Sequence, residues 1–463
     1  MQTTTKLVEY CAEVEFDMLP TPAVEAAKIE LLDCLGVGLA AIDAPGVAEL
    51  MRLNSVWGGK QESAVLGYNI SLPAPNAAQM NATIMHARDF DDIHARSLTH
   101  PGIISVSSAL ATAELVGGVS GKDFLAALAM GTDLICRLGM AVRSDQPRGA
   151  LGWHFTAVFG FPASAAVAGR LLRLNQEKML NALAIAYHQS SGNGQCVLDG
   201  ALTKRLGPGF AVRGGITAAL LAEAGVTGAS GWLEGEAGIY QLYFRSPCND
   251  RTLLSELGVR FEGANVATKR YPGCGAVHPY IDATLHLMGN NKFATGDIEE
   301  IVVVHGEGTR FLIEPVKAKC EPRNPVDLQF SVPWVVATAL AEGKVTLEHF
   351  TEEAIRNEKI TSLSARVVPV FDSKFSRIDG AEAGKVELKL KGKRHLAAMC
   401  ENTVNEGGQR MTFADCTNKF YACADFSILE IDAKALRKVV ELVKDFEDVR
   451  DASELIRLLQ PGK

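Results

Sequence analysis

The densest group of polar side chains in the sequence lies between residues 86 and 102. It holds three histidines and three carboxylates, namely His86, Asp89, Asp91, Asp92, His94 and His100. Helical spacing would place His86 and Asp89 on one face of a helix, before Pro101 prevents a straightforward continuation. A histidine whose tautomer is fixed by a carboxylate suits general acid–base catalysis. A helix end with solvated carboxylates is the alternative, and a metal site is less favoured because no H-E-x-x-H motif is present.

Three further segments place histidines or cations beside a turn or a helix start. His154 opens a nearly uncharged helix, whose dipole disfavours the imidazolium form, although it could also be a core histidine. Lys204 precedes a predicted Gly-Pro-Gly turn at residues 207–209, which could present the lysine and backbone N–H groups to a carboxylate. Surface cations beside a turn are the alternative. Lys269 and His278 bracket a tight turn at the predicted domain boundary, where ligand sites are favoured.

These four segments concentrate cations and histidines in a chain that is acidic as a whole. The 463 residues include 46 Lys and Arg against 54 Asp and Glu, a formal charge of -8. This charge argues against nucleic acid and anionic membranes as partners, because both need a basic surface. The four segments together fit a pocket for a small anionic carboxylic acid.

The sequence also predicts a cytoplasmic protein. Its first 16 residues carry Glu9, Glu13 and Glu15 and lack the layout of a signal peptide. The longest stretch without Asp, Glu, Lys or Arg, residues 149–169, falls short of the ~20 predominantly apolar residues that a bilayer requires, so we expect a buried helix there. Ten cysteines are spread along the chain without a C-x-x-C pair, which predicts reduced thiols.

The elements that must position these side chains are mostly helices over the first 260 residues. The Thr21-Pro22 pair predicts a helix start, with threonine as the N-cap, for a helix that runs to Leu39. Ala-rich segments predict further helices at residues 75–86, 103–116, 121–142, 156–172, 176–188 and 210–224. Because small side chains let helices approach closely, we expect an all-helical core.

Near residue 265 the pattern changes to strands mixed with helices. Residues 298–305 are rich in β-branched side chains, and Val386, Leu388 and Leu390 alternate with charged residues. Helices are expected between them at residues 277–288, 326–341 and 351–362. From Thr412 the helical period returns, so we expect the tail to pack on the first domain. The predicted fold is mainly α, with a large all-helical domain (1–264 plus 409–463) and an inserted, smaller α/β lid domain (265–408).

Taken in order, the motifs resemble those of the MmgE/PrpD family, whose members include dehydratases, decarboxylases and epimerases of small carboxylic acids. The matching pieces are His86-x-x-Asp89-Phe90-Asp91-Asp92, Thr99-His100-Pro101, Trp153-His154-x-Thr156, Thr203-Lys204, Lys269-x-Tyr271-Pro272-x-Cys274-x-x-x-His278, Ile281-Asp282-Ala283, Phe330-Ser331-x-Pro333 and Asn418-Lys419-Phe420. The resemblance implies a homodimer, an active site at the junction of helical domain and lid, and chemistry without a metal or organic cofactor.

Carried over motif by motif, the resemblance also implies the active-site residues. They are Asp89, His100, His154, Lys204, Lys269 and His278. We expect His100 and His154 to be the acid and the base, with Asp89 orienting or acidifying the site. The remaining three would face the substrate carboxylates and the negative charge that develops during the reaction.

Two positions depart from the family pattern. Ile93 stands where decarboxylase-like members have threonine, and Trp334 stands where many members have tyrosine. We expect both side chains to contact the substrate. The site would then have two hydroxyl groups fewer and more apolar bulk, which leaves the substrate open.

The residue types leave the reaction open as well. Loss of a proton or of CO2 beside a carboxylate leaves a carbanion-like centre, and we expect a cofactor-independent lyase that dehydrates or decarboxylates a small di- or tricarboxylic acid, such as 2-methylcitrate or cis-aconitate. An epimerase that returns an α-proton to a dicarboxylate such as iminodisuccinate is the alternative. A metal-dependent hydrolase and a noncatalytic helical interaction protein are two further classes, and the latter would scatter the histidines and lysines over the surface.

Overall fold

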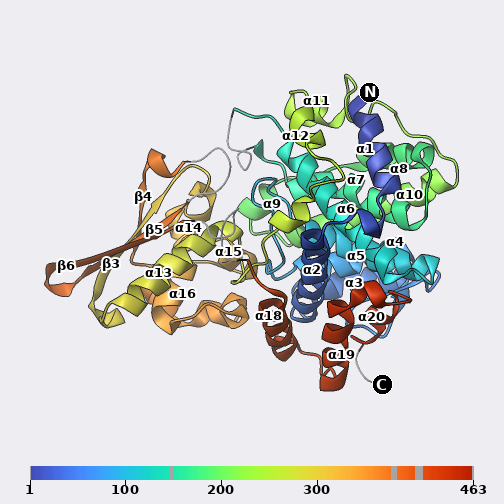
Figure 1. The fold of residues 1–463 in the computed structure, drawn as a ribbon. Helices are drawn as coiled ribbons and strands as arrows, with labels where there is room; N and C mark the ends of the chain where they lie inside the picture. The colour runs from blue at the N-terminus through green and yellow to red at the C-terminus, as the bar shows by residue number, and fades with distance from the viewer. Residues whose placement is uncertain (1, 146–150, 377–382, 402–409, 461–463) are drawn as a thin grey trace.

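The computed structural model describes residues 2–145, 151–376, 383–401 and 410–460. In these residues a large helical domain lies beside a smaller lid that contains a four-stranded sheet (Figure 1). Each part has its own apolar core: one is built from residues 7–266 together with 416–459, and the other from residues 277–390. The fold is therefore mainly α, as the sequence predicted, and both ends of the chain belong to the helical part.

The helical domain is built around helices that are buried on nearly all sides. Its helices are α1 (Gln2–Glu13), α2 (Thr21–Leu39), α3 (Val47–Trp57), α4 (Ala74–His86), α5 (Pro101–Val116), α6 (Gly121–Met140), α7 (Phe155–Leu171), α8 (Gln176–Gln189), α9 (Gln195–Leu198), α10 (Thr203–Glu223), α11 (Ile239–Phe244) and α12 (Asp250–Leu254). Small residues let the central helices touch. A Cβ atom on Gly131 of α6 would lie only 2.2 Å from Val167 of α7. The short strands β1 (Ser63–Ala64) and β2 (Ser71–Leu72) form a small antiparallel pair.

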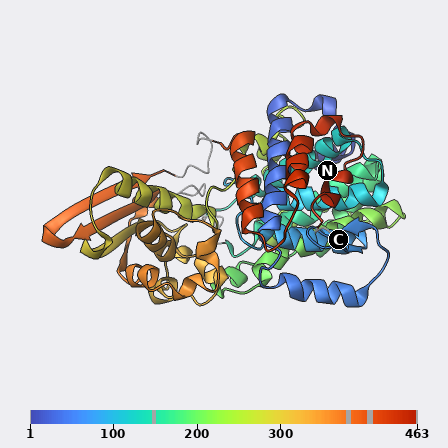
Figure 2. The same cartoon turned by 90° about the horizontal axis from the view of Figure 1, so that it is seen from below.

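The C-terminal tail returns to the helical domain, as the period after Thr412 predicted. It forms α18 (Phe413–Phe426), α19 (Ala433–Lys444) and α20 (Glu454–Arg457), and α18 lies along α2 in both views (Figures 1 and 2). Gly36 of α2 allows this close approach, since a Cβ atom there would lie 3.0 Å from the Phe420 backbone. Lys419 also forms a 2.7 Å ion pair with Asp33 of α2.

The lid is a four-stranded sheet with helices on one face. The strand order is β4-β3-β5-β6, from β4 (Val367–Phe371), β3 (Ile298–His305), β5 (Gly384–Leu390) and β6 (Arg394–Cys400). Strand β3 runs parallel to β4 and antiparallel to β5. The helices are α13 (His278–Asn290), α14 (Val316–Cys320), α15 (Pro325–Gln329), α16 (Val332–Glu342) and α17 (Glu358–Ser364). The predicted alternation in β5 is confirmed, because Val386, Leu388 and Leu390 are buried and the charged residues between them are partly exposed.

One predicted turn is wrong. Helix α10 begins at Thr203 and passes without a break through the Gly-Pro-Gly segment at residues 207–209. Close packing accounts for this: a Cβ atom on Gly209 would lie 2.4 Å from the Thr83 hydroxyl of α4. The glycines thus let α10 approach its neighbours, and these contacts outweigh the low helix propensity of Gly and Pro.

Within the described residues, the helices all fall short of the length and apolar character needed to cross a bilayer. All ten cysteines are free, and most are buried. The stretch at residues 149–169 contains most of α7, which is buried as predicted.

Candidate active site

The site begins where helix α4 ends, at His86. The helix does not continue to Asp89, which has a positive φ of 50°. Aspartate tolerates this left-handed conformation better than most residues do. The turn brings the Asp91 carboxylate back to the end of the helix, 2.9 Å from His86 Nδ1. The predicted pairing of His86 with Asp89 through helical spacing is therefore wrong, and Asp91 takes that place.

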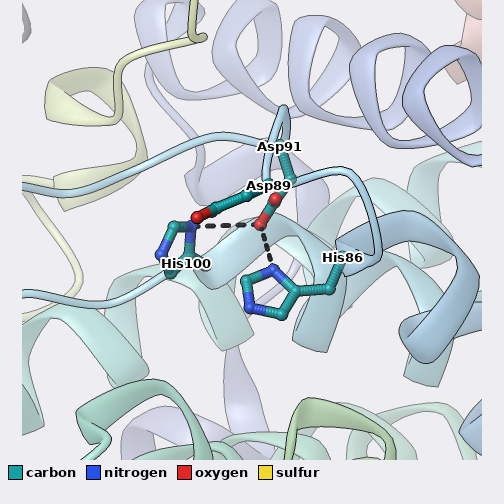
Figure 3. Close-up of side chains that lie close together, drawn as sticks. All are labelled: His86, Asp89, Asp91 and His100. Atoms are coloured by element: carbon teal, nitrogen blue, oxygen red, sulfur yellow. Dashed lines mark hydrogen bonds and ion pairs between the residues drawn. The ribbon is translucent and has the colours of Figure 1, made fainter. Parts of the chain in front are cut away.

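The Asp91 carboxylate joins two histidines through a single oxygen atom. Its Oδ2 atom lies 2.9 Å from His86 Nδ1 and 3.0 Å from His100 Nδ1 (Figure 3). His100 Nδ1 also lies 2.7 Å from the backbone oxygen of Asp92. Carbonyl and ionised carboxylate oxygens only accept hydrogen bonds, so Nδ1 carries the proton in both rings. Each Nε2 atom is then left with a lone pair.

Asp89 is held between two lysines. The Lys269 ammonium donates to its Oδ1 at 2.8 Å and to its backbone oxygen at 2.9 Å, and the Lys204 ammonium lies 3.1 Å from Oδ1. Burial would raise the pKa of Asp89, but the two ammonium groups outweigh burial and hold this pKa well below its usual range. Lys204 Nζ lies 5.2 Å from the centre of the Phe330 ring and makes no hydrogen bond within the described residues. Lys204 therefore has N–H groups to offer a ligand.

His154 precedes α7 and faces the same cluster. Its ring centre lies 6.1 Å from that of His86, and a Cβ atom on Gly207 would lie 3.2 Å from its Nδ1. Burial and the ammonium of Lys204 lower the pKa of His154 well below that of a free imidazole. The sequence predicted a neutral imidazole from the helix dipole. The neutral form is favoured, although burial is the main cause.

The residues of the cluster differ in how far their side chains are exposed to solvent. His86, Asp89, Asp91 and Lys269 are almost entirely buried, whereas His154 is partly exposed and the His100 side chain is 12% exposed. The charged pairs thus lie behind the two histidines. The arrangement leaves these two imidazoles as the acid–base groups that a substrate can reach.

The lid contributes to the site through the segment that follows Lys269. The Gly273 N–H donates to the backbone oxygen of Asp89 at 3.0 Å, and the Gln329 amide lies 3.4 Å from the Ala87 oxygen. His278, the first residue of α13, is fully buried, and its Nε2 atom lies 3.0 Å from the Tyr271 oxygen. Its Nδ1 atom has no hydrogen-bond partner within the described residues. The loop at the end of α4 is therefore in direct contact with the lid.

For the other two predicted substrate contacts, Ile93 and Trp334, the structure shows backbone pairing and packing in the lid. The Ile93 backbone pairs with Ala267 in an isolated antiparallel bridge, and its side chain is half-buried. Trp334 lies in the lid core with no exposed surface, and its indole N–H donates to the His349 oxygen at 3.0 Å. Its ring is thus used in packing the lid, and the structure does not bring it to the histidines. The loss of a hydroxyl there gives no direct information on the substrate.

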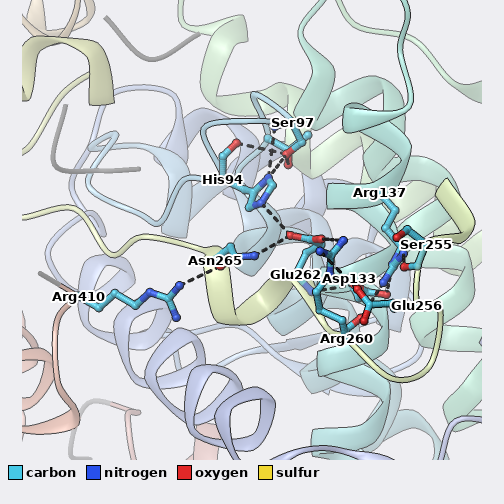
Figure 4. A network of polar contacts seen from close by, with 11 residues as sticks. His94, Ser97, Asp133, Arg137, Ser255, Glu256, Arg260, Glu262, Asn265 and Arg410 are labelled. Atoms are coloured by element: carbon cyan, nitrogen blue, oxygen red, sulfur yellow. Dashed lines mark hydrogen bonds and ion pairs between the residues drawn. The ribbon is translucent and has the colours of Figure 1, made fainter. Parts of the chain in front are cut away.

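A second polar network positions the loop that carries His100. His94 Nδ1 lies 2.8 Å from the Ser97 hydroxyl, and its Nε2 atom lies 3.6 Å from a Glu262 oxygen (Figure 4). Glu262 accepts a hydrogen bond from Asn265 at 2.8 Å, and Asn265 in turn accepts one from Arg410 at 2.9 Å. Asn265 and Arg410 lie at the two connections between helical domain and lid. The network ties both connections to the loop between α4 and α5.

The cluster also contains the atoms that a metal ion would need. One potential ligand atom from each of His86, Asp89, Asp91 and His100 lies within 4.8 Å of the others. The Asp89 oxygen already contacts two ammonium groups, and both Nδ1 atoms already donate to Asp91. A cation would have to displace these partners and would lie close to two lysines. The chemistry of the donor set therefore favours a network of hydrogen bonds and ion pairs.

Sequence reasoning assigned eight residues to the site, and Asp91 and Phe330 were not among them. Asp91 belongs to the motif that drew attention first, but helical spacing placed Asp89, and not Asp91, on the same face as His86. Phe330 belongs to a matching motif too, yet an aromatic residue carries no signal of a cation contact until Lys204 is placed beside it. Charge and spacing in the sequence identified the polar residues of the cluster. Their contacts depend on the turn at Asp89, which the sequence did not predict.

Gly207 offers a test of how exactly His154 must be placed. A Cβ atom there would lie 3.2 Å from His154 Nδ1, so Gly207→Ala should push the imidazole aside by a few tenths of an ångström. We expect kcat to fall about 10-fold, with a normal melting temperature, because small displacements of a reacting group are costly. Gly289→Ala in α13, where a Cβ atom would meet nothing within 4 Å, should leave kcat unchanged. Equal rates for the two variants would contradict the placement of His154.

Buried histidines should make the fold sensitive to acid. Burial, and then the Lys269 ammonium, lower the pKa of His278 to about 3, whereas an unfolded imidazole titrates near ~6.5. Between these values the unfolded chain binds a proton that the folded protein does not, so stability falls as the pH drops through this window. His278→Gln should therefore reduce the slope of unfolding free energy against pH by about 1.4 kcal/mol per pH unit.

Urea unfolding at several pH values between about 6 and 4 measures this slope. Glu30, whose pKa burial raises to about 8, has the opposite effect on the wild-type curve, but it is the same in both proteins and cancels in the comparison. His286→Gln, at an exposed position of α13, is the matched control and should leave the slope unchanged. Equal slopes for His278→Gln and the wild type would show that His278 is not kept neutral by the fold.

Comparison with known proteins covers both parts of the chain. The family model of the MmgE/PrpD N-terminal domain matches residues 5–251, and the family model of the MmgE/PrpD C-terminal domain matches residues 271–445. The chain is 27% identical to a cis-aconitate decarboxylase-like protein of Aspergillus oryzae, over 98% of this chain and 97% of the relative. It is 26% identical to human cis-aconitate decarboxylase, over 94% and 90% of the two chains. A 2-methylcitrate dehydratase of Cupriavidus necator is 23% identical over 81% and 78%.

Proposed function

The chain belongs to the MmgE/PrpD family, and from this premise we propose that it is a cofactor-independent lyase that dehydrates or decarboxylates a small di- or tricarboxylic acid. The observation that carries the proposal is the convergence of His100, His154 and Lys204 on one cluster at the junction with the lid. Relatives that match nearly the whole chain are two cis-aconitate decarboxylases and a cis-aconitate decarboxylase-like protein, which favours an acid of that type. A 2-methylcitrate-like acid is the second candidate.

His100 is the better candidate for the base. Its Nδ1–H is held by the Asp91 carboxylate and the Asp92 oxygen, so its Nε2 lone pair is free to accept a proton. The negative charge of Asp91 stabilises the imidazolium that then forms. A base held in this way contributes about 10²- to 10⁴-fold to a proton transfer.

His154 is the better candidate for the donor on the other side of the reaction. Its neutral form is favoured, and a neutral imidazole can donate an N–H to an oxygen of the substrate. When a bond to CO2 breaks, its electron pair remains on the carbon skeleton and spreads into the neighbouring carboxylate. When water is lost, a proton leaves the α-carbon and the hydroxyl leaves with a second proton. Dehydration therefore needs one group that takes a proton and one that gives it, whereas decarboxylation needs a donor that returns a proton to the carbon skeleton.

The lysines supply the electrostatic part of the mechanism. Lys204 has N–H groups without a hydrogen-bond partner and lies beside His154, so it can hold a substrate carboxylate. Lys269 is fully buried and bonded to Asp89, which suits it to fixing that carboxylate between the lysines. A carbanion-like state places negative charge on the substrate carboxylate, and an ammonium group fixed beside it stabilises that charge.

An experiment with a panel of acids tests the function. Purified protein would be incubated with cis-aconitate, 2-methylcitrate and iminodisuccinate in D2O and followed by NMR. A new alkene from the saturated acid, or release of CO2 from the unsaturated one, supports the lyase. Deuterium uptake at an α-carbon without either change would instead support the epimerase, the alternative that the residue types leave open. No change with any acid would contradict both.

Two other classes receive little support from the site. A noncatalytic interaction protein would scatter the lysines and histidines, whereas here they converge. A metal-dependent hydrolase would lose its activity on treatment with EDTA, and we expect the rate to be unaffected. We further propose a homodimer in the cytoplasm, which mass photometry and fractionation would test.

A further inference from the structure

The proposed mechanism gives no role to His86, although this buried histidine lies in the middle of the cluster. Its ring is 1% exposed and lies between two other imidazoles, with ring centres 4.9 Å from His100 and 6.1 Å from His154. Its Nδ1 donates to Asp91, and its Nε2 has no hydrogen-bond partner within the described residues. A buried polar group in such a place needs an explanation.

We propose that His86 is a positioning residue that acts through Asp91, fixing the direction and the strength with which this carboxylate holds His100. The proposal rests on the proposed function, in which His100 is the base. It adds a residue behind the reacting groups that sets how readily the base accepts its proton.

The proposal is based on the single Asp91 oxygen that both histidines contact. Both imidazoles donate to Asp91 Oδ2, while Oδ1 is buried and has no hydrogen-bond partner within the described residues. Two donors on one oxygen compete for the same negative charge, so each weakens the other's bond. The His86 donor therefore limits how strongly Asp91 favours a proton on His100. It also fixes the carboxylate, which would otherwise be free to rotate away.

The charges around His86 suit a constant donor better than a proton carrier. Burial lowers its pKa to about 4, the Asp91 carboxylate partly opposes this, and the Lys204 ammonium and a charged His100 reinforce it. The imidazole thus stays neutral at ordinary pH, and its Nδ1–H is always present. A relay would require this ring to gain and lose a proton in every turnover.

Three substitutions separate these roles. In His86→Asn the amide nitrogen lies near the position of Nδ1 and can still donate to Asp91. In His86→Gln it lies near Nε2 instead, and His86→Leu removes both donors. We expect His86→Leu to lower kcat about 10- to 100-fold with KM within about 3-fold, because a misplaced carboxylate misplaces the base. His86→Asn should recover most of this loss.

The pH profile gives a readout that loss of structure would not produce. Without the His86 donor, the full charge of Asp91 acts on His100 and favours its protonated form. The acidic limb of kcat against pH should therefore move to higher pH in His86→Leu and His86→Gln, by about half a unit or more. It should stay near the wild-type position in His86→Asn. Unchanged limbs in all three folded variants would overturn the proposal.

A measurement without substrate separates this proposal from the proposed function. Protein labelled with 15N in its histidine rings reports the tautomer of each imidazole by NMR, with His100→Asn identifying the His100 signal. We expect the Nδ1–H tautomer of His100 in the wild type and in His86→Asn, and a mixture of tautomers or a protonated ring in His86→Leu. The same His100 spectrum in every variant would overturn the proposal, whatever acid the enzyme consumes.

The remaining outcomes are also decisive. If His86→Asn is folded but as inactive as His86→Leu, the ring itself is needed, and His86 is a proton carrier rather than a positioning residue. If His86→Leu does not fold, His86→Gln gives the same comparison. If the wild type converts none of the acids but the His100 tautomer depends on His86, the proposed function fails and the positioning role stands.

Discussion

Replacing His100 with asparagine should lower kcat by about 10²- to 10⁴-fold, because the reaction loses its base while the loop keeps its shape. The asparagine amide lies near the position of Nδ1 and can still donate to Asp91 and to the backbone oxygen of Asp92, as His100 does. The Nε2 lone pair has no counterpart in the variant. KM should change by no more than about 3-fold, since the lysines that hold the substrate are untouched.

Steady-state kinetics on the acid found by NMR, together with a thermal melt, measure this effect. His286→Asn, at an exposed position of α13, is the matched control and should have the wild-type rate. His154→Gln should be as inactive as His100→Asn if the two imidazoles handle the proton in turn. A kcat within 10-fold of the wild type in His100→Asn would move the base to another residue, with His154 the next to test.

Local signals predicted the helical framework well. Helix α5, which was predicted at residues 103–116, begins at Pro101 and ends at Val116, and α7 follows the His154 segment, as the sequence indicated. In β5, side chains alternate between the lid core and the surface, and the sequence shows the same alternation of apolar and charged residues. These elements need only the local chain to be recognised, because their apolar faces repeat with the period of the structure.

The arrangement of the site depended on features that no local period records. The turn at Asp89 rests on one residue with positive φ, and it decides that Asp91 rather than Asp89 meets His86. Helix α10 passes through Pro208 because the neighbouring helices require close contact there. Trp334 was expected at the substrate from a motif, and in the structure its ring is buried in the lid core. Residue types thus predicted the members of the cluster better than their partners.

In the structure, carboxylates balance the positive charge of the two lysines in the site. The sequence suggested a concentration of positive charge, but within the described residues each buried lysine of the site has a carboxylate partner. Lys204 and Lys269 share Asp89, and Asp91 adds a second negative charge beside His86 and His100. With neutral histidines, these four ionised groups sum to zero. A polyanionic substrate therefore depends on the few N–H groups that remain free, above all those of Lys204.

Lys204→Met should consequently reduce kcat/KM by about 10³-fold. The variant keeps an unbranched side chain of similar length, and Lys269 still neutralises Asp89, so the carboxylate that contacts Lys204 keeps a cation partner. We therefore expect a melting temperature close to that of the wild type. The site would carry one net negative charge and would repel an anionic substrate, while the carbanion-like state would lose the ammonium group that still has N–H groups to donate.

The same reasoning predicts how the loss divides between binding and reaction. If Lys204 only attracted the substrate, KM would rise and kcat would hold, and an exposed lysine could partly substitute for it. If it stabilises the developing charge, kcat must fall as well, because that charge is larger in the transition state than in the bound acid. Lys434→Met, exposed on α19, controls for the loss of a positive charge at a distance. A loss confined to KM would limit Lys204 to substrate binding and leave charge stabilisation to His154.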